Sequence, residues 1–169
     1  DKIKDVEGRL TIKYYPPKSA TVNTFRKHLD KLIRKGTEVD MIIVDYGDLV
    51  RPSKARNAKR MELEEIYEEL RALASEMKCP LWTASQTNRS GLNTDVVTME
   101  AISEAFSKCF VADFIMSLSR TVDDKPANGG RVFVAKNRNG GDGFVYPIFM
   151  DTGYVAIDVL EAQGNTTEE

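Results

Sequence analysis

The sequence predicts an α/β protein with a mixed, mainly parallel sheet that is flanked by helices and ends in an antiparallel β-meander. In the first half of the chain, short β-favouring apolar segments alternate with long amphipathic segments, as in strand–helix units. The helical crossovers of about 20 residues between successive strands favour parallel pairing. In the last third, tight turns separate the strands, which favours antiparallel pairing.

Composition indicates one globular domain over residues 1–160, because 41% of the 169 residues are apolar. No apolar run approaches the length of a membrane span, so we expect a cytoplasmic protein without a membrane partner. The net charge of -2 means that nucleic-acid binding would need a local cluster of basic residues. We interpret Cys79 and Cys109 as buried apolar residues and the single histidine, His28, as solvent-facing. Residues 161–169 have the composition of a disordered tail.

The first predicted elements are a strand and a helix. Residues of Arg9–Tyr15 alternate between polar and apolar, and Pro16–Pro17 ends this strand because proline cannot donate to a strand ladder. A helix follows, and either Ser19 or Thr21 can cap its first amides. Gly36 supplies its C-terminal stop.

The central strand is predicted at Met41–Val44, where four apolar residues in a row indicate burial on both faces of a parallel sheet. It is followed by Asp45. Open α/β sheets bind their ligands at the carboxyl ends of their strands, so Asp45 is a candidate functional residue. The local pattern leaves open the alternative that Asp45 caps the turn after the strand.

A basic loop, Arg51–Arg60, follows this strand, with five Lys and Arg residues and no acidic residue. Such a loop could bind a phosphate backbone, and an ordinary solvated loop fits the composition equally well. The next helix is predicted from about Ala58 to Met77. Its glutamates between Glu62 and Glu69 form an acidic face that we expect to be solvated. The predicted buried stripe of this helix consists of Ile66, Leu70, Leu73, Ala74 and Met77.

A third strand is predicted over Cys79–Ser85, and it also ends in polar residues, beginning with Gln86. A short helix is predicted over Thr98–Lys108 and a fourth strand over Phe114–Ser119. The Asp-, Asn- and Gly-rich segment 123–130 is predicted to be a turn or a hairpin tip.

The final strands form the predicted meander. Arg131–Gly140 carries two cations, Lys136 and Arg138, which lie on the same side of the strand because side chains alternate with a period of two. A glycine-rich turn leads into Phe144–Met150, which is predicted to pair with Tyr154–Asp158.

Polar residues at these strand ends match the parts of a nucleoside-triphosphate site. Asp45 would hold a magnesium ion, usually through water, and Gln86 would order the attacking water or sense the terminal phosphate. Arg138 would neutralise charge in the transition state. A phosphate cradle of the form Gly-x-x-x-x-Gly-Lys-Ser/Thr is missing from the sequence. The glycine cluster Gly140–Gly143 lacks the lysine and joins two strands, so we interpret it as a turn.

At these residues the sequence resembles the DnaB-type hexameric replicative helicases, including their phage versions, which have a RecA-like (P-loop NTPase) core. The resemblance extends in order and spacing over roughly residues 9–158. The last of its motifs is the most specific. The motifs are Ile43–Tyr46, Leu70–Pro80, Ser85–Arg89 and Val134–Gly140.

The resemblance implies an ATP-dependent DNA helicase that uses Mg²⁺, translocates on single-stranded DNA and unwinds duplex DNA in a bacterial or phage-infected cell. It further implies a homo-hexamer, with a primase or a helicase loader as possible partners. Asp45 matches the Walker B aspartate and Gln86 the glutamine that senses the γ-phosphate. Arg138 matches the arginine finger and Lys136 its companion, and in the family both act on the nucleotide of the neighbouring subunit.

The resemblance also implies a DNA-binding segment from Arg89 through Ser103 to Lys108, which would line the central channel. Two departures stand out: Asp48 occupies a position where a neutral residue is expected, and Glu104 replaces an expected glycine. Further candidates for DNA contacts come from the basic loop, namely Arg51, Lys54 and Arg56.

In the family, the phosphate cradle and the catalytic glutamate lie upstream of the matched segment. We therefore expect the C-terminal part of an ATPase domain, without the opening P-loop strand and inactive by itself. The first predicted strand begins near residue 1, which favours a fragment over a degenerate relative. Two other interpretations stay open: another RecA-family ATPase, such as a recombinase or a clock-type ATPase, and a catalytically dead interaction or oligomerisation module.

Overall fold

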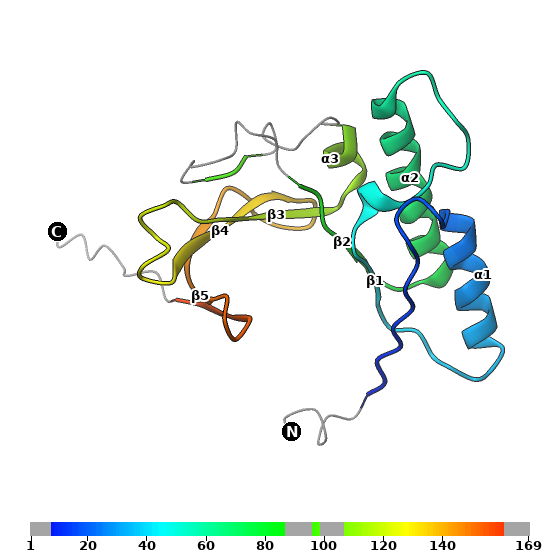
Figure 1. Cartoon of the computed structure of the whole chain (residues 1–169), viewed down its shortest axis with the longest axis horizontal. Coiled ribbons are helices and arrows are strands. Elements are labelled where there is room, and N and C mark those ends of the chain that lie inside the picture. Colours follow the sequence, from blue (N-terminus) through cyan, green and yellow to red (C-terminus); the bar gives the residue numbers. More distant parts are fainter. Residues whose placement is uncertain (1–7, 87–95, 99–106, 161–169) are drawn as a thin grey trace.

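The computed structural model describes residues 8–86, 96–98 and 107–160, so the predicted C-terminal tail lies outside the described residues. Figure 1 shows α1 and α2 on one side of the short β1–β2 pair, and the antiparallel strands on the other side. In this part of the chain, no helix is both long and apolar enough to span a membrane.

Helix α1 spans Val22–Ile33 and confirms the first predicted helix. Thr21, one of the two predicted caps, accepts a hydrogen bond from the backbone N–H of Thr24, and the Thr24 side chain accepts one from the Thr21 N–H in return. This reciprocal capping satisfies amides that the helix leaves without partners. Gly36 follows with a φ of 82°, which suits glycine because it has no Cβ.

Helix α2 spans Lys59–Met77, close to its predicted bounds. Its C-cap residue, Lys78, has a left-handed φ of 54°, which ends the helix. Ala74 and Met77 of the predicted stripe are only half-buried. Six residues from α1, α2 and the loop before α2 form the apolar core: Val22, Val50, Leu63, Ile66, Leu70 and Leu73.

Strands β1 (Ile42–Val44) and β2 (Leu81–Thr83) pair in parallel, as the crossover through α2 predicts. The prediction that β1 is buried on both faces is wrong. Ile42 is buried and Val44 packs against the core, but Ile43 between them is 69% exposed. Because side chains alternate along a strand, only the face that α2 covers is removed from solvent.

The strand predicted over Arg9–Tyr15 does not form. Residues 8–15 have no strand hydrogen bonding, and the side chains of Leu10, Ile12 and Tyr14 are at least 75% exposed. A strand needs a neighbour for its backbone N–H and C=O groups, and among the described residues none pairs with this segment. Alternating polarity alone therefore did not determine this element.

Of the short helix predicted over Thr98–Lys108, residues 99–106 lie outside the described part of the chain. The described helix continues to Val111, beyond the predicted end at Lys108, and four strands follow in the order β3-β4-β5-β6, all antiparallel. The predicted meander is confirmed, and β3 joins its edge. The bounds are α3 Ser107–Val111, β3 Phe114–Ser119, β4 Gly129–Asn137, β5 Val145–Asp151 and β6 Ala156–Val159.

The two sheets meet where β2 faces the beginning of β3. The rings of Trp82 and Phe114 contact edge to face, with centroids 6.1 Å apart. The described strands thus form one parallel pair and one antiparallel sheet that share an apolar boundary.

Both cysteines have free thiols, and Cys109 is buried as predicted whereas Cys79 is half-buried. Burial raises the pKa of each thiol, so both stay protonated at neutral pH. Neither thiol therefore has the thiolate character of a nucleophile.

Candidate functional site

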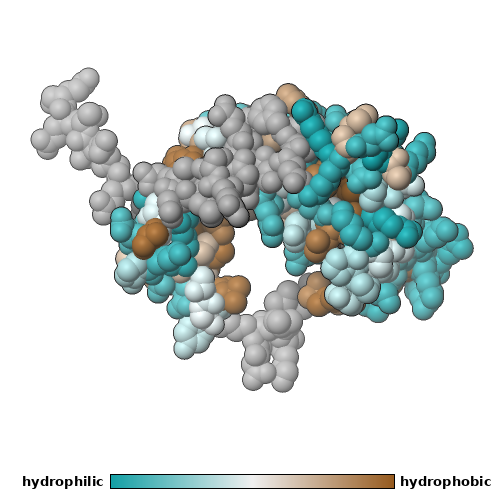
Figure 2. Space-filling view, turned by 45° about the horizontal axis from the view of Figure 1, so that its top comes forward, coloured by the Kyte–Doolittle hydropathy of each residue, from teal (hydrophilic) through white to brown (hydrophobic). Residues whose placement is uncertain are grey.

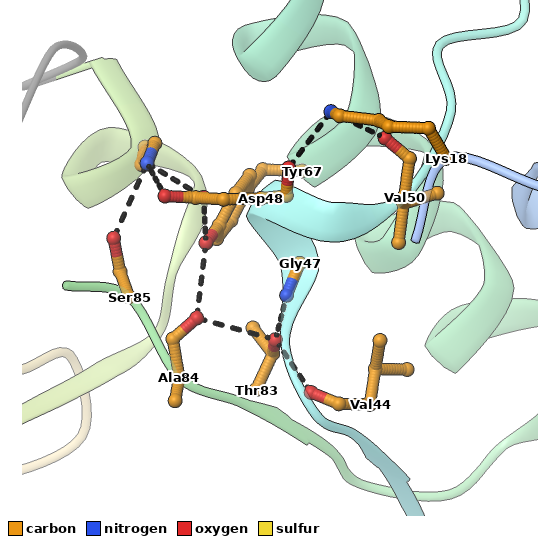
Figure 3. A network of polar contacts seen from close by, with 10 residues as sticks. Lys18, Val44, Gly47, Asp48, Val50, Tyr67, Thr83, Ala84 and Ser85 are labelled. Carbon is orange, nitrogen blue, oxygen red and sulfur yellow. Dashed lines mark hydrogen bonds and ion pairs between the residues drawn. The ribbon is translucent and has the colours of Figure 1, made fainter. Parts of the chain in front are cut away.

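The carboxyl ends of β1 and β2 lie side by side and are cross-linked by a single hydroxyl group. Val44 is in register with Thr83, whose Oγ1 donates to the Val44 carbonyl at 2.8 Å and accepts from the Gly47 N–H at 2.8 Å (Figure 3). Asp45 directly follows Val44, and Gln86 follows Thr83 by three residues. Both candidate residues therefore leave the sheet at the same edge, and both are exposed.

The Asp45 side chain has no hydrogen-bond or ion-pair partner in the described part of the chain. The turn after β1 uses other acceptors: the Gly47 N–H bonds to Thr83, and the Leu49 N–H bonds to the Tyr46 carbonyl. The alternative role of Asp45 as a turn cap is thus not observed. Its carboxylate oxygens are available to a cation or to water.

A short 3-10 helix, η1 (Gly47–Leu49), follows Asp45 and carries the unexpected Asp48. The Lys108 ammonium of α3 contacts both Asp48 carboxylate oxygens, at 2.7 and 2.8 Å, and also the Ser85 hydroxyl at 3.2 Å. The Lys108 side chain is only 3% exposed. A buried cation is tolerated when it is paired and hydrogen-bonded, so Asp48 has its explanation in Lys108.

Tyr67 of α2 completes this cluster. Its hydroxyl donates to Asp48 Oδ1 at 2.9 Å and contacts the Ala84 carbonyl at 3.2 Å, and its ring lies 5.2 Å from the Lys108 ammonium. Burial and the charge of Asp48 raise the pKa of the Tyr67 phenol above its ordinary value, so the phenol stays neutral. We call Asp48, Tyr67, Ser85 and Lys108 the Lys108 cluster, in which Lys108 is buried and the other three side chains are half-buried.

Of the three candidate residues in the predicted DNA-binding segment, the structure describes only Lys108. Arg89 and Ser103 lie outside the described residues. Lys108 differs from the expectation, because its ammonium is turned inward and bonded to Asp48 and Ser85. A DNA phosphate would have to replace these internal partners, so the geometry gives Lys108 an internal role.

Lys136 and Arg138 both contact the end of α3 and the residues that follow it. The Lys136 ammonium donates to the carbonyls of Cys109 at 2.8 Å and Phe110 at 3.3 Å. Arg138 donates its backbone N–H to the Asp113 carbonyl at 2.9 Å, and its guanidinium lies 2.7 Å from Asp113 Oδ1. The two cations thus reach one segment, in line with their predicted placement on the same side of β4.

The Asp113 carboxylate joins two arginines, which the sequence reasoning missed. Arg71 of α2 lies 2.9 Å from the same Oδ1 atom and also donates to the Val111 carbonyl. The side chains of Asp113 and Arg138 are each about half exposed, which makes this a surface ion pair. The only local signal for Asp113 was its position directly before a predicted strand.

The basic loop is tied to the acidic face of α2, which is therefore less solvated than predicted. The Arg56 guanidinium pairs with Glu65 at 3.0 Å and its backbone N–H donates to Glu62, while Ser53 donates to Glu69. Arg56 is thus already partly neutralised. The other two candidate DNA-binding residues of this loop are exposed: Arg51 and Lys54.

Comparison with known proteins identifies the family. The model of the DnaB-like helicase C terminal domain matches residues 4–154. The DnaB-like replicative helicase of Enterobacteria phage T4 is 33% identical over 141 residues, which are 81% of this chain and 30% of that protein. The replicative DNA helicase DnaB of Mycobacterium leprae is 32% identical over 114 residues, or 64% of this chain and 19% of that protein.

Solved structures agree with the predicted fold class. A solved ATPase domain matches with a TM-score of 0.74 and 23% identity, covering 84% of this chain and 52% of that chain. A DnaB-like replicative helicase, described with its interactions with primase, matches with a TM-score of 0.68 and 22% identity, covering 79% of this chain and 34% of that one. The RecA-like fold is thereby confirmed, and the chain spans less than a third of the two relatives compared by sequence. By its sequence and its fold, this chain belongs to the DnaB-like helicase C-terminal domain family.

Proposed function

We propose that this chain is the C-terminal portion of the ATPase domain of a replicative DNA helicase, which hydrolyses ATP to move along single-stranded DNA and unwind duplex DNA. The observation that carries the proposal is the cross-linked edge of β1 and β2. This edge bears an exposed carboxylate without a partner among the described residues, Asp45, and an exposed amide, Gln86. Carboxyl ends of parallel strands are where α/β sheets bind nucleotides.

At this edge, Asp45 would hold Mg²⁺ and Gln86 would contact the γ-phosphate of ATP. The described residues contain no group of three or more His, Cys, Asp or Glu that could form an all-protein metal site. A single carboxylate such as that of Asp45 suits Mg²⁺, because this ion binds through one or two carboxylates, several waters and substrate phosphates. Mg²⁺ held by Asp45 would supply positive charge that neutralises the charge developing on the phosphate oxygens.

Arg138 and Lys136 would act on the nucleotide bound by a neighbouring subunit in a homo-hexameric ring. Arg138 directly follows β4 of the antiparallel sheet, and its side chain is 49% exposed. Its ion pair with Asp113 is exposed as well, and such pairs contribute little, so a phosphate can compete for the guanidinium. A guanidinium supplied by a neighbour stabilises the charge of the transition state.

An exposed strip of apolar side chains on β1, β2 and β3 indicates that another segment of the same ATPase domain packs here. The Trp82–Phe114 contact connects β2 to β3 within this strip. Figure 2 shows apolar side chains, in brown, along the hollow between the helical part and the antiparallel sheet. We assign the strip to the other half of the domain, because this chain covers only 52% of the solved ATPase domain that it resembles. Its exposed residues are Ile43, Trp82, Phe114, Met116 and Leu118.

The term complete ATPase chain denotes residues 1–169 together with the other half of the domain in one polypeptide. The missing half would contribute the phosphate cradle and the catalytic glutamate, so residues 1–169 alone should not turn over ATP. Single-stranded DNA would contact Arg89, Ser103 and the exposed residues of the basic loop, Arg51 and Lys54. The primase named with one structural relative is a candidate partner of the complete protein.

The test is the substitution Arg138→Ala in the complete ATPase chain. We expect DNA-stimulated ATP hydrolysis to fall by about three orders of magnitude or more, as for other arginine fingers. Arg34→Ala, which removes an exposed arginine after α1, serves as the matched control and should leave the rate unchanged. If Arg138→Ala left every activity of the complete protein unchanged, Arg138 would not be an arginine finger, and residues 1–169 would serve as an interaction or oligomerisation module. A strand-displacement assay separates helicases from other RecA-family ATPases.

A further inference from the structure

The Lys108 cluster has no role in the function proposed above. Lys108 is 3% exposed, and its ammonium contacts both oxygens of Asp48. Ordinary lysines stay in water because burial of their charge is costly. The presence of a lysine at this buried position is therefore not explained by the solubility that surface lysines provide.

The cluster joins the two strand ends of the candidate nucleotide site to α3. Asp48 lies three residues after Asp45, and Ser85 directly precedes Gln86. Lys108 bonds to both Asp48 and Ser85. One ammonium thus fixes the segments that carry the candidate metal ligand and the candidate phosphate sensor.

Carbonyl groups of α3 and a residue beyond it contact Lys136 of β4 and Arg138, which directly follows β4. Cys109, the residue after Lys108, and Phe110 accept hydrogen bonds from Lys136 through their carbonyls. Asp113, two residues beyond α3, binds the backbone and the guanidinium of Arg138. Helix α3 therefore lies between the subunit's own nucleotide edge and the finger pair.

We propose that Lys108 is a positioning residue whose ion pair with Asp48 links the γ-phosphate sensor of one subunit to the arginine finger that the subunit offers to its neighbour. This inference rests on the proposed function, since it uses the roles assigned to Gln86 and Arg138. A shift of the end of β2 on nucleotide binding or hydrolysis changes the Ser85 contact of Lys108. Through α3, the same shift reaches the carbonyls that hold Lys136.

The contribution of the Asp48–Lys108 pair to stability can be measured separately from its contribution to coupling between the two sites. Removal of one charge leaves the other without its counter-charge in a site where Lys108 is 3% and Asp48 22% exposed, which destabilises the fold, whereas removal of both charges is better tolerated. The double variant Lys108→Met with Asp48→Asn thus restores the charge balance, but it lacks the directional bonds to Asp48 and Ser85. Only this variant distinguishes a positioning link from a structural ion pair.

The experiment compares the two single variants, the double variant and the control Lys27→Met, which alters an exposed lysine of α1, in the complete ATPase chain. The readouts are the thermal unfolding midpoint, kcat and KM for ATP with single-stranded DNA, and DNA affinity with a non-hydrolysable ATP analogue. We expect the double variant to unfold at the parent's temperature, with KM and DNA affinity unchanged. Its kcat should fall by about tenfold, the size of a typical coupling between sites.

Two outcomes would overturn the inference. A double variant with the parent's kcat, whether or not the single variants lose activity, would make the pair purely structural. Weaker DNA binding in Lys108→Met, with normal binding in Asp48→Asn, would make Lys108 a DNA ligand. If Arg138→Ala hydrolyses ATP normally the proposed function itself fails, whereas an inactive Arg138 variant beside a fully active double variant refutes only the link.

Discussion

The hydroxyl group of Tyr67 connects three segments that lie far apart in the sequence. It donates to Asp48 Oδ1 in η1 and contacts the Ala84 carbonyl after β2, while its ring faces the Lys108 ammonium of α3. Tyr67→Phe removes one hydrogen bond to a charged acceptor that retains Lys108. We therefore expect this change to lower the free energy of unfolding by about 1–2 kcal/mol at neutral pH.

The pH dependence of stability gives Tyr67 a distinct signature. Burial and the Asp48 charge raise the pKa of its phenol in the folded chain, whereas the unfolded chain titrates near the ordinary value of 10.0. Above that pH the unfolded chain loses a proton that the folded chain retains, so the free energy of unfolding falls as the pH rises. Denaturant unfolding at several alkaline pH values should show a shallower fall for Tyr67→Phe than for the parent, and identical slopes would contradict this account.

Local patterns singled out some residues of the candidate site and not others. Asp45, Gln86, Lys136 and Arg138 could be singled out because each directly follows or ends a recognisable strand. The partner of Asp48 could not, because Lys108 is 60 residues away and an ion pair leaves no mark in either local pattern. From the sequence, Asp48 could be recognised only as a departure from the neutral residue that the family resemblance leads us to expect there.

At the scale of secondary-structure elements, the helices were more predictable than the strands. Periodicity and end signals gave α1 and α2 nearly to the residue, because caps and stops are local interactions. A strand forms only when another segment pairs with it, and the local sequence does not show which segment that is. The segment Arg9–Tyr15 has no such neighbour among the described residues, and those residues leave Ile43 of β1 largely uncovered.

The capping pair of α1 provides a test at this scale. Thr21→Ala removes the oxygen that accepts the Thr24 N–H and should destabilise the chain by about 1 kcal/mol. Thr21→Ser keeps a hydroxyl at the same position and is the control. Urea unfolding of the three proteins measures the effect, and equal stability of the alanine and serine variants would show that the cap does not contribute.

At the scale of the whole molecule, the uncovered strip on β1, β2 and β3 makes a prediction about the complete ATPase chain. If the other half of the domain covers this face, Trp82 and Met116 should be oxidised more slowly in the complete chain than in residues 1–169 alone. Met61 of α2, equally exposed but outside the strip, is the control. Hydroxyl-radical footprinting with mass spectrometry measures each residue separately, and equal oxidation of Trp82 in both chains would leave the strip unassigned.

The central claim is that one subunit contributes Asp45 and the next contributes Arg138 to the same ATP. Substitution of either residue by alanine in the complete ATPase chain should abolish hydrolysis. Co-expression of the two variants with different tags, followed by purification through both tags, gives rings in which an Arg138→Ala subunit can lie beside an Asp45→Ala subunit. One such interface combines an intact Asp45 with an intact Arg138.

The decisive measurement is the ATP hydrolysis rate of these mixed rings. Sites assembled between subunits predict activity well above that of either variant alone, from roughly one interface in four in a randomly mixed symmetric ring. Mixed rings as inactive as the two parent variants would place both residues in a site within one subunit and would contradict the account.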